Sequence, residues 1–412
     1  MKKWEFSIPC ALDARFRWMV VPLALNCRSF VKSFHFLKRK NMAFSYWESK
    51  EWLEGIDLCV IGGGIVGLSA AIFAKEKHPH WHIVVLESTP FGGGGSSKNA
   101  GFACFGSASE LRQDRMELGD KEALQLVKKR LEGLQLLRRT LGDEAIGFSA
   151  CGSVEFFVPG GLKPLRDEEL KDLNEWISGA TGVSNTFETC AASKFSEYAS
   201  RPEERAIFSR LEGVIDTGRL NRTMRGRAHE MGIDLICGME VKRLDEFETG
   251  WSVKVEQGKN NGAVHAPRVV IATNAFAREL MPMADVAPAL NRVLVTEPIP
   301  NWDFHHAVHL EAGYVYARSI GNRMLIGGGR HWDLPPADTE KKLEDWLHSL
   351  WPRTKKAAIA YRWVGYLGIG SSRQPIIRKL GRGAVAAVRM GGMGIAIGMQ
   401  VGKQAAELLS SD

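Results

Sequence analysis

The sequence has no run of about 18 consecutive apolar residues, the length that a membrane-spanning helix needs. It has seven cysteines, and no two of them form a C-x-x-C pair. An odd number of scattered cysteines in a chain of 412 residues argues against a disulfide framework and favours a reducing compartment. We therefore expect a globular protein without a transmembrane segment. We also expect a cytoplasmic location, with peripheral membrane association left open.

The chain also lacks a general basic bias, although its net charge is +7. Residues 1–41 hold nine Lys and Arg against two Asp and Glu, and the remaining residues hold 45 of each sign. Because the excess is confined to one end, the sequence predicts no nucleic-acid partner. We expect residues 1–41 to be a disordered or non-native extension, with translation beginning at Met42. The alternative is a signal peptide or organellar presequence, since a short apolar stretch at 18–25 follows two arginines.

No cluster of histidine, cysteine and carboxylate side chains has the spacing of a metal site. His78, His80 and His82 are close in sequence, but they fall in an expected turn between a helix and a strand. The sequence therefore predicts no metal.

Apolar segments with strand and helix patterns alternate along the chain, which is typical of α/β proteins. A Gly/Ser-rich loop is expected at residues 88–109. The expected strands are Asp57–Ile61, His82–Glu87, Asp234–Val241, Trp251–Glu256, Ala263–Ala272, Val293–Glu297, Tyr314–Arg318, Arg323–Gly327 and Ala384–Val388, and residues 150–200 carry turn signals and short apolar runs such as Val154–Val158. The expected helices are Gly64–Lys77, Gly119–Leu141, the second part of Leu211–Gly232, Glu340–Leu350 and Gly394–Leu409.

The first strand, the helix after it and the second strand contain a G-x-G-x-x-G pattern at Gly62, Gly64 and Gly67. The first glycine permits a tight strand-to-helix turn, the second lets a pyrophosphate approach the backbone, and the third permits close packing of the helix. The free N–H groups and the positive end of the helix dipole then favour phosphate. Glu87 ends the second strand, where a carboxylate can accept hydrogen bonds from both ribose hydroxyls and repel a 2′-phosphate. FAD and NAD both fit this unit, and NADP is disfavoured.

The segment after the second strand favours FAD. Residues 95–101 read GSSKNAG, which resembles the G-[AT]-S-x-[RK]-N-[GA]-G loop of the FAD-dependent D-amino-acid oxidase-like family. The resemblance implies that Ser97, Lys98 and Asn99 follow the pyrophosphate and ribityl chain and that residues 100–102 pass near the flavin ring. Without it, the segment would be a flexible polar loop.

Later segments resemble the same family in the same order, so the resemblance covers residues from about 55 to 412. It implies that the Val241 backbone contacts adenine, that residues 272–274 lie beside the cofactor, and that the turn at 391–394 directs a helix N-terminus at the flavin N1–C2=O edge. Such a helix end stabilises negative charge. The predicted cofactor residues are Gly62, Gly64, Ile65, Val66, Gly67, Glu87, Ser88, Ser96, Ser97, Lys98, Asn99, Ala100, Gly101, Val241, Ala272, Thr273, Asn274, Gly391, Gly392, Met393, Gly394 and Ile395.

The substrate residues are predicted from the same resemblance. Tyr314, Tyr316 and Arg318, followed by a glycine run, resemble the family's Y-x-x-x-R hairpin, whose arginine often pairs with a substrate carboxylate. A guanidinium suits this role because it offers a bidentate fork. We expect Arg318 to bind the carboxylate, with Tyr316 and Arg330 in the same pocket; the alternative is a structural ion pair or a solvated arginine.

Two departures from the family pattern leave the substrate open. A second carboxylate-binding arginine, which some amine oxidases carry after W-x-G, is absent after Trp363, and the D-x-x-P turn lacks its acid at 372–375. No Cys or His matches a covalent attachment point, so the FAD is expected to be non-covalent.

Together these features predict a Rossmann-type FAD-binding domain (residues 42–145, 205–282 and 362–412) and a mainly antiparallel-sheet substrate domain (residues 146–204 and 283–361). The predicted reaction is hydride transfer from an amine or amino acid to FAD, giving an imine, with oxygen or a carrier as electron acceptor. The alternatives are oxidation of a 2-hydroxy acid and a non-catalytic FAD-binding subunit.

Overall fold

The computed structural model describes residues 44–158, 160–195, 197, 204–258 and 260–409. These residues belong to one compact unit that extends from Asn41 to Asp412. The predicted extension at residues 1–41 lies outside the described residues and stays a prediction.

A six-stranded sheet carries the predicted dinucleotide unit, and the α/β prediction is confirmed. Five of its strands are parallel, and the edge strand β18 is antiparallel to β19. The order across the sheet is β18 (Ile376–Gly381), β19 (Ala384–Val388), β12 (Val269–Ile271), β1 (Leu58–Ile61), β2 (Ile83–Glu87) and β8 (Asp234–Cys237).

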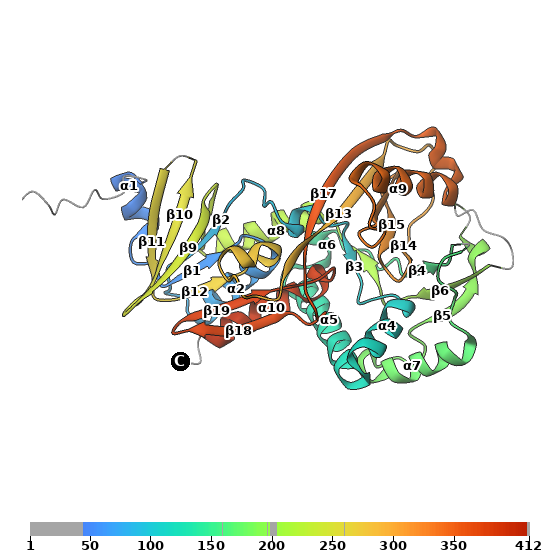
Figure 1. Ribbon diagram of the computed structural model, residues 1–412, viewed down its shortest axis with the longest axis horizontal. Coiled ribbons are helices and arrows are strands. Elements are labelled where there is room, and N and C mark those ends of the chain that lie inside the picture. Colours follow the sequence, from blue (N-terminus) through green and yellow to red (C-terminus); the bar gives the residue numbers. More distant parts are fainter. Residues whose placement is uncertain (1–43, 159, 196, 198–203, 259, 410–412) are drawn as a thin grey trace, which may run out of the picture. The chain divides into compact units, whose positions relative to one another are not determined.

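The two faces of this sheet are covered by different layers, because successive side chains of a strand point to opposite faces. Leu58 and Val60 of β1 belong to the core with helices α2 (Ile65–Lys77) and α10 (Gly394–Leu409). Cys59 and Ile61 belong to the core with a three-stranded antiparallel sheet (Figure 1). That sheet consists of β9 (Glu240–Phe247), β10 (Gly250–Gln257) and β11 (Asn260–Ala266). Both faces of β1 are therefore buried, which explains its uninterrupted apolar sequence.

Two strands expected as single elements are each divided between the two sheets. The segment 234–241 forms β8 and then β9, because Gly238 has a φ of +79° and turns the chain between them. The segment 263–272 forms the end of β11 and then β12, with Pro267, which has no N–H, between them.

An eight-stranded sheet forms the second large layer, and its mainly antiparallel pairing is confirmed. Only one of its pairings, between β14 and β4, is parallel. The order is β17 (Ile359–Ile369), β13 (Ala287–Thr296), β16 (Arg323–Gly328), β15 (Val315–Ile320), β14 (Ala307–Leu310), β4 (Ser153–Phe156), β6 (Arg205–Ser209) and β5 (Glu188–Ala191). Helix α9 (Pro336–Leu350) packs on it through Leu343 and Leu347.

The other elements connect these layers. A small two-stranded sheet pairs β3 (Phe102–Ala103) with β7 (Gly213–Val214). The remaining α-helices are α1 (Tyr46–Glu48), α3 (Gly95–Lys98), α4 (Ala108–Leu118), α5 (Asp120–Leu141), α6 (Asp143–Ile146), α7 (Asp167–Thr181) and α8 (Thr217–Glu230), with a π-helical turn η1 (Ser49–Leu53) and 3₁₀ turns η2 (Ala192–Lys194), η3 (Asn274–Glu279) and η4 (Pro352–Lys356).

Helices α2 and α10 approach each other closely, and this contact brings their N-termini to the same region. A Cβ atom on Gly402 would lie 2.5 Å from the Val66 carbonyl oxygen, and one on Gly398 would lie 2.8 Å from Ile65. Glycine at these positions is therefore what allows the last helix to pack against the first helix of the dinucleotide unit.

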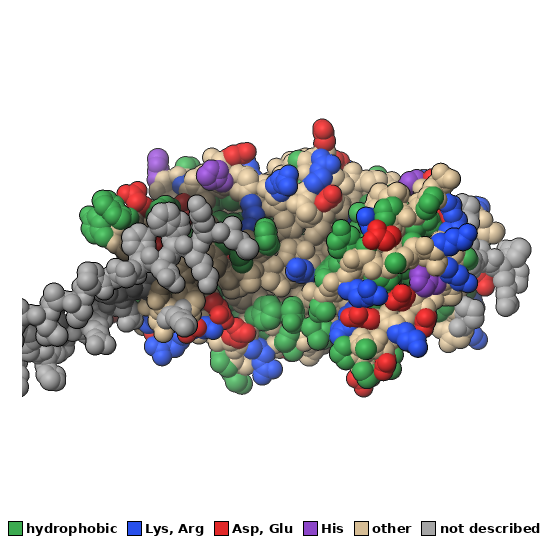
Figure 2. Space-filling model, turned by 90° about the horizontal axis from the view of Figure 1, so that it is seen from above, with side chains coloured by type: hydrophobic (Ala, Val, Ile, Leu, Met, Phe, Trp, Pro, Cys, Tyr) green, Lys and Arg blue, Asp and Glu red, His purple; other side chains and the backbone are tan. Residues whose placement is uncertain are grey.

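No helix among the described residues is long and apolar enough to cross a membrane. On the face shown in Figure 2, Lys and Arg side chains are interspersed with Asp and Glu side chains. The coloured part of that face therefore carries no continuous strip of one charge.

Candidate functional site

The turn between β1 and α2 has the geometry that the glycine pattern predicts. Gly62 has a φ of +105°, and a Cβ atom on it would lie 2.8 Å from the Ala272 carbonyl oxygen. A Cβ atom on Gly67 would lie 1.9 Å from the Gly62 carbonyl oxygen. A side chain at either position would therefore force the turn open.

The backbone amides at the start of α2 form a cradle. The Ile65 N–H donates to Ser96 Oγ at 3.0 Å, and the Gly63 N–H donates to Glu87 Oε2 at 2.9 Å. Within the described residues, no hydrogen bond engages the N–H of Gly64 or Val66. Two unpaired amides at a helix N-terminus suit an anionic group such as a phosphate.

Glu87 lies at the end of β2, buried beside this cradle. Besides the Gly63 amide, its carboxylate accepts the Thr89 N–H at 3.1 Å and the Thr89 hydroxyl at 3.2 Å. These bonds fix the orientation of the carboxylate at the edge where a ribose is expected.

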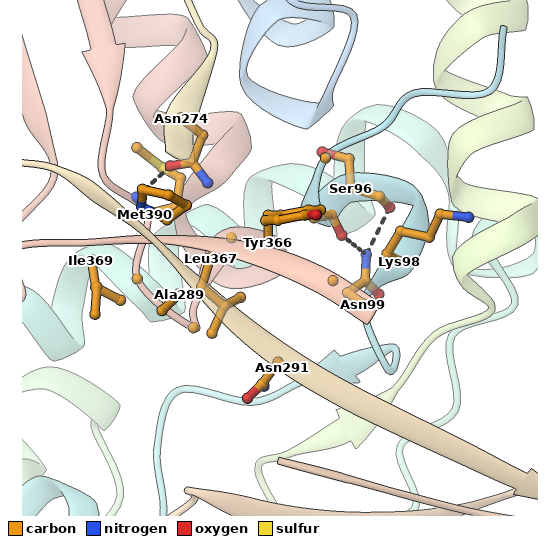
Figure 3. A pocket seen from close by; sticks show the side chains of 18 of the residues that line it. Ser96, Lys98, Asn99, Asn274, Ala289, Asn291, Tyr366, Leu367, Ile369 and Met390 are labelled. Atoms are coloured by element: carbon orange, nitrogen blue, oxygen red, sulfur yellow. Dashed lines mark hydrogen bonds between the residues drawn. The ribbon is translucent and has the colours of Figure 1, made fainter. Parts of the chain in front are cut away.

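The segment expected as a Gly/Ser-rich loop contains a helical turn, α3, ordered by Asn99 (Figure 3). The Asn99 Nδ2 donates to the carbonyls of Ser96 at 2.7 Å and Gly95 at 3.2 Å. Its Oδ1 accepts the Gly101 N–H at 2.9 Å and the Thr217 hydroxyl at 2.7 Å. One side chain therefore holds both ends of the turn, which is why this glycine-rich stretch has a defined conformation.

The turn before α10 is held from two sides. The Met390 N–H donates to Asn274 Oδ1 at 3.0 Å (Figure 3), and the Gly391 N–H donates to the Gly368 carbonyl at 3.0 Å. Arg389, with a φ of +66°, donates to the Gln374 carbonyl at 2.9 Å and pairs with Asp285. Asp285 also accepts the Ser371 N–H, so it supplies a carboxylate next to the turn at 372–375, whose expected acid is missing. Asp285 lies 86 residues before Ser371 in the chain, so no local sequence pattern identifies it as the acid of this turn.

One cavity of about 1250 Å³ connects the cradle to the eight-stranded sheet. This volume exceeds the range of about 300–1,000 Å³ for small-ligand pockets, so an extended ligand can fit. Of the predicted cofactor residues, Gly67, Ser97 and Gly101 do not line it. Those that line it are Gly62, Gly64, Ile65, Val66, Glu87, Ser88, Ser96, Lys98, Asn99, Ala100, Val241, Ala272, Thr273, Asn274, Gly391, Gly392, Met393, Gly394 and Ile395.

Arg318 has a different place from the one predicted for it. It is buried and does not line the cavity. Its Nη1 donates to the carbonyls of Gly101 and Ile215, each at 2.8 Å. Because these backbone groups occupy the guanidinium, the structure corrects the expectation that Arg318 faces a substrate carboxylate.

The predicted partners of Arg318 do line the cavity. Tyr316 is a hydrogen-bond acceptor for Asn291 Nδ2 at 3.1 Å, and burial raises the pKa of its phenol to about 12. The Arg330 guanidinium lies 4.4 Å from the Tyr314 ring centroid. No hydrogen bond or ion pair joins this guanidinium to another described residue, and burial lowers its pKa. It therefore offers an unpaired positive fork to the cavity.

A buried ionic cluster, which sequence analysis missed, lies along the same wall of the cavity. Asp114 pairs with Arg130 at 2.9 Å and with Arg373 at 2.7 Å. Glu110 and His309 also line the cavity. The only sequence signal was the S-x-x-E pattern of Ser107 and Glu110, in which the Ser107 hydroxyl accepts the Glu110 N–H at the start of α4.

One group of side chains bears on the prediction that the protein binds no metal. Among the described residues, Cys104, Glu212 and His309 place three potential ligand atoms within 4.8 Å of one another. Each already has a protein partner, since Cys104 Sγ donates to the Gly213 carbonyl at 3.5 Å and Glu212 bonds to His309 at 3.0 Å. We interpret the group as a hydrogen-bonded network.

The parallel sheet, the glycine cradle and the acidic strand end define a dinucleotide-binding protein of the Rossmann class. Residues 57–408 match the family model described as FAD dependent oxidoreductase, and the chain belongs to this family. It is therefore an FAD-dependent oxidoreductase.

Named relatives share most of the chain. The sequence is 26% identical over 375 residues to gamma-glutamylputrescine oxidoreductase of Escherichia coli K12, which covers 86% of this chain and 84% of that protein. The fold resembles L-proline dehydrogenase from P. horikoshii (TM-score 0.69, 19% identity, 87% of this chain and 94% of the other). It also resembles glycine oxidase from Geobacillus kaustophilus (TM-score 0.66, 20% identity, 86% and 94%).

Proposed function

We propose that the protein oxidises an amino acid or a related carboxylate-bearing amine at the carbon next to nitrogen. The observation that carries this proposal is the continuity of one cavity from the α2 cradle to the unpaired Arg330 guanidinium. Such a cavity suits a long cofactor at one end and a small anionic substrate at the other. The named relatives act on an amine or on amino acids, which supports the same choice.

The residues present fit an FAD. The unpaired amides of Gly64 and Val66 suit the pyrophosphate, and the Glu87 carboxylate suits the adenosine ribose. The Thr273 hydroxyl is buried on the cavity wall without a hydrogen-bond partner among the described residues, as expected of a group that a ligand completes. We therefore assign cofactor contacts to the predicted residues that line the cavity, and give Gly67, Ser97 and Gly101 a supporting role. We propose that the cofactor is bound non-covalently.

When bound, FAD supplies the hydride acceptor. The protein's own part is to orient the substrate, to exclude water and to hold its charged groups. In this proposal Arg330 replaces Arg318 as the ligand of the substrate carboxylate. Tyr316 forms the adjacent wall, and because its hydroxyl oxygen accepts from Asn291 Nδ2, its O–H is left to donate to a ligand.

The predicted division into a cofactor domain and a substrate domain remains part of this proposal. The parallel sheet would hold the cofactor, and the eight-stranded sheet would carry the substrate residues on β13, β15 and the end of β16. The electron acceptor is proposed to be oxygen or a carrier, and the location to be cytoplasmic.

The test is anaerobic bleaching of the purified flavoprotein by a panel of amines, amino acids and 2-hydroxy acids. We expect amino acids to bleach the flavin. Bleaching by a hydroxy acid alone would support the alternative oxidation, and bleaching by no compound would support a non-catalytic FAD subunit.

The carboxylate role of Arg330 has its own test, in which pivalate binding is followed by perturbation of the flavin spectrum. We expect Arg330→Met to weaken pivalate binding at least tenfold, because a charge-assisted hydrogen bond contributes about 1.5–3 kcal/mol. Arg353→Met, at a half-exposed arginine that pairs with Glu197 and does not line the cavity, is the matched control. Unchanged pivalate affinity in Arg330→Met would remove Arg330 from this role.

A further inference from the structure

The Glu110 side chain reaches the cavity wall without a close partner in the described part of the chain. It lies in the first turn of α4, and its side chain is 12% exposed. The nearest ion-pair contact of its carboxylate is Arg373 Nη1 at 3.9 Å. No hydrogen bond to another described residue engages its carboxylate oxygens. An acidic group is thus presented to the cavity that holds Arg330.

Glu110 and His309 face the same point of this cavity. Gly313 has a φ of +77°, and a Cβ atom added to it would lie 2.9 Å from Glu110 Oε2 and 3.9 Å from His309 Nδ1. The glycine therefore leaves free a position that lies within reach of both side chains.

His309 is held from behind by a buried carboxylate. Its Nε2 bonds to Glu212 Oε2 at 3.0 Å, and Glu212 Oε1 accepts the N–H of Phe105 at 2.7 Å and of Gly106 at 2.9 Å. The pKa of His309 is raised by Glu212, Glu110 and Glu155 against the effect of burial. The ring is thus fixed with Nδ1 toward Glu110 and the cavity.

The charges around Glu110 come from every element packed against it. Asp114 lies on the same helix, Arg130 on α5, His309 on β14, Arg373 after β17 and Arg330 after β16.

The two arginines nearest to Glu110 are largely neutralised by other acids. Arg130 pairs with Asp114 at 2.9 Å, and Arg373 pairs with Asp114 at 2.7 Å and with Glu117 at 3.2 Å. Burial is the largest effect on Glu110 and raises its pKa. A raised pKa brings a carboxylate closer to the basicity of an amine that must lose a proton near neutral pH.

We propose that Glu110 is a catalytic residue that binds the substrate ammonium group and takes one of its protons, positioned by the His309–Glu212 pair. This inference rests on the proposed function, since only an amine substrate supplies such a proton. In the step, one ammonium N–H bond breaks and one O–H bond forms on the Glu110 carboxylate. The substrate becomes a neutral amine and Glu110 a neutral acid. The lone pair left on nitrogen is what permits hydride to leave the adjacent carbon.

Arg330 and Glu110 then form the two poles of the substrate site. One guanidinium takes the carboxylate, and one carboxylate takes the amine. The substrate class is therefore an amino acid in its zwitterionic form rather than a plain amine or a plain acid.

Binding of two matched probes tests this without turnover. 2-Aminoisobutyrate carries both charges and has no hydrogen on the reacting carbon, and pivalate replaces its ammonium group with a methyl group. Both are titrated into the flavoprotein while the flavin absorbance is followed. We expect the wild type to prefer 2-aminoisobutyrate at least tenfold. We expect Glu110→Gln to lose that preference while its affinity for pivalate stays within twofold.

Glu117→Gln is the control, because it makes the same change one to two turns along the same helix in a more exposed side chain. It should keep the preference. Flavin content and the thermal midpoint of both variants establish that they are folded. A wild type without the preference, or a Glu110→Gln protein that retains it, overturns the proposal.

The pH dependence of flavin reduction gives a second readout. In the wild type, the apparent affinity for an amino acid that bleaches the flavin should hold below the pKa of the free amine, because Glu110 accepts the proton. In Glu110→Gln, the pH below which the apparent affinity falls should rise toward the pKa of that amine. If this pH is the same in Glu110→Gln as in the wild type, the role of Glu110 is contradicted even if bleaching occurs. If no amine or amino acid bleaches the flavin, the proposed function itself is contradicted.

Discussion

Arg318 and Arg330 are twelve residues apart, and their surroundings assign them opposite tasks. Arg318 satisfies two backbone carbonyls inside the protein, whereas Arg330, among the residues that the structure describes, contacts the Tyr314 ring and faces the cavity. The sequence suggested the first as the substrate ligand, because the hairpin pattern identifies a strand but not which side of it becomes packed. Only the neighbours of each guanidinium separate a structural arginine from a binding one.

Replacing Arg318 should therefore affect stability and not substrate affinity. Arg318→Ala leaves two buried carbonyls without their donor, at a cost of about 1–3 kcal/mol each in the free energy of unfolding. Denaturant titration measures this loss. Arg362→Ala, which removes a half-exposed partner of Glu344, should change stability by less than about 0.5 kcal/mol.

The opposite result is also informative. An Arg318→Ala protein of normal stability with a strongly raised KM for its amino acid would return the carboxylate role to Arg318.

At the scale of elements, the strand–turn–helix of the dinucleotide unit was the most predictable part of the molecule. Its start and end agree with the structure to within one residue, because buried parallel strands and glycine turns leave local signals. The divided strands β8–β9 and β11–β12 were not predicted, since apolar alternation continues across the turn at Gly238 and across Pro267. Glu110 and His309 were missed for a related reason. Both side chains lie near Gly313, and this proximity of residues about 200 positions apart is encoded by no local pattern.

A methyl group at Gly67 should separate α2 from its own N-terminal turn. The 1.9 Å approach to the Gly62 carbonyl leaves no room for Gly67→Ala, so the cradle must shift. We expect affinity for FAD to fall at least tenfold, measured by titration of the apoprotein with FAD. Gly226→Ala in α8 is the control, because no atom lies within 4 Å of the added Cβ.

The two substitutions should also change the free energy of unfolding in opposite directions. Gly226→Ala should stabilise the protein by about 0.5–1 kcal/mol, since alanine loses less backbone entropy in a helix interior. Equal FAD affinity in the two variants would contradict the close packing of α2.

At the scale of the whole molecule, the His309–Glu212 pair should make the free energy of unfolding depend on pH. The pKa of Glu212 is lowered in the folded protein, so its contribution is present above its ordinary value of 4.5 and is lost as the pH falls through the lowered pKa. The pKa of His309 is raised, so its contribution is full below its ordinary value of 6.5 and is lost as the pH rises through the raised pKa.

The pair therefore stabilises the fold most between about pH 4.5 and 6.5. The difference in thermal midpoint between the wild type and His309→Gln should be largest in this window and should shrink above it. His305→Gln, at an exposed histidine, should show no such window. A difference that does not vary with pH would mean that His309 is neutral in the folded protein.

The wall of the cavity at residues 389–395 and 397 follows the cradle at Gly64 by more than 300 residues in the chain. The cradle at Gly64 can form early, but the turn that faces it is anchored to Asn274 and continues into α10. Arg318, which ties Gly101 to the eight-stranded sheet, also emerges more than 200 residues after that loop. The loop at Gly101 therefore gains its contact with Arg318 only after residue 318 has been synthesised, and the wall that faces the cradle forms only after residue 397. An enclosed cofactor site therefore cannot form before synthesis has passed residue 397.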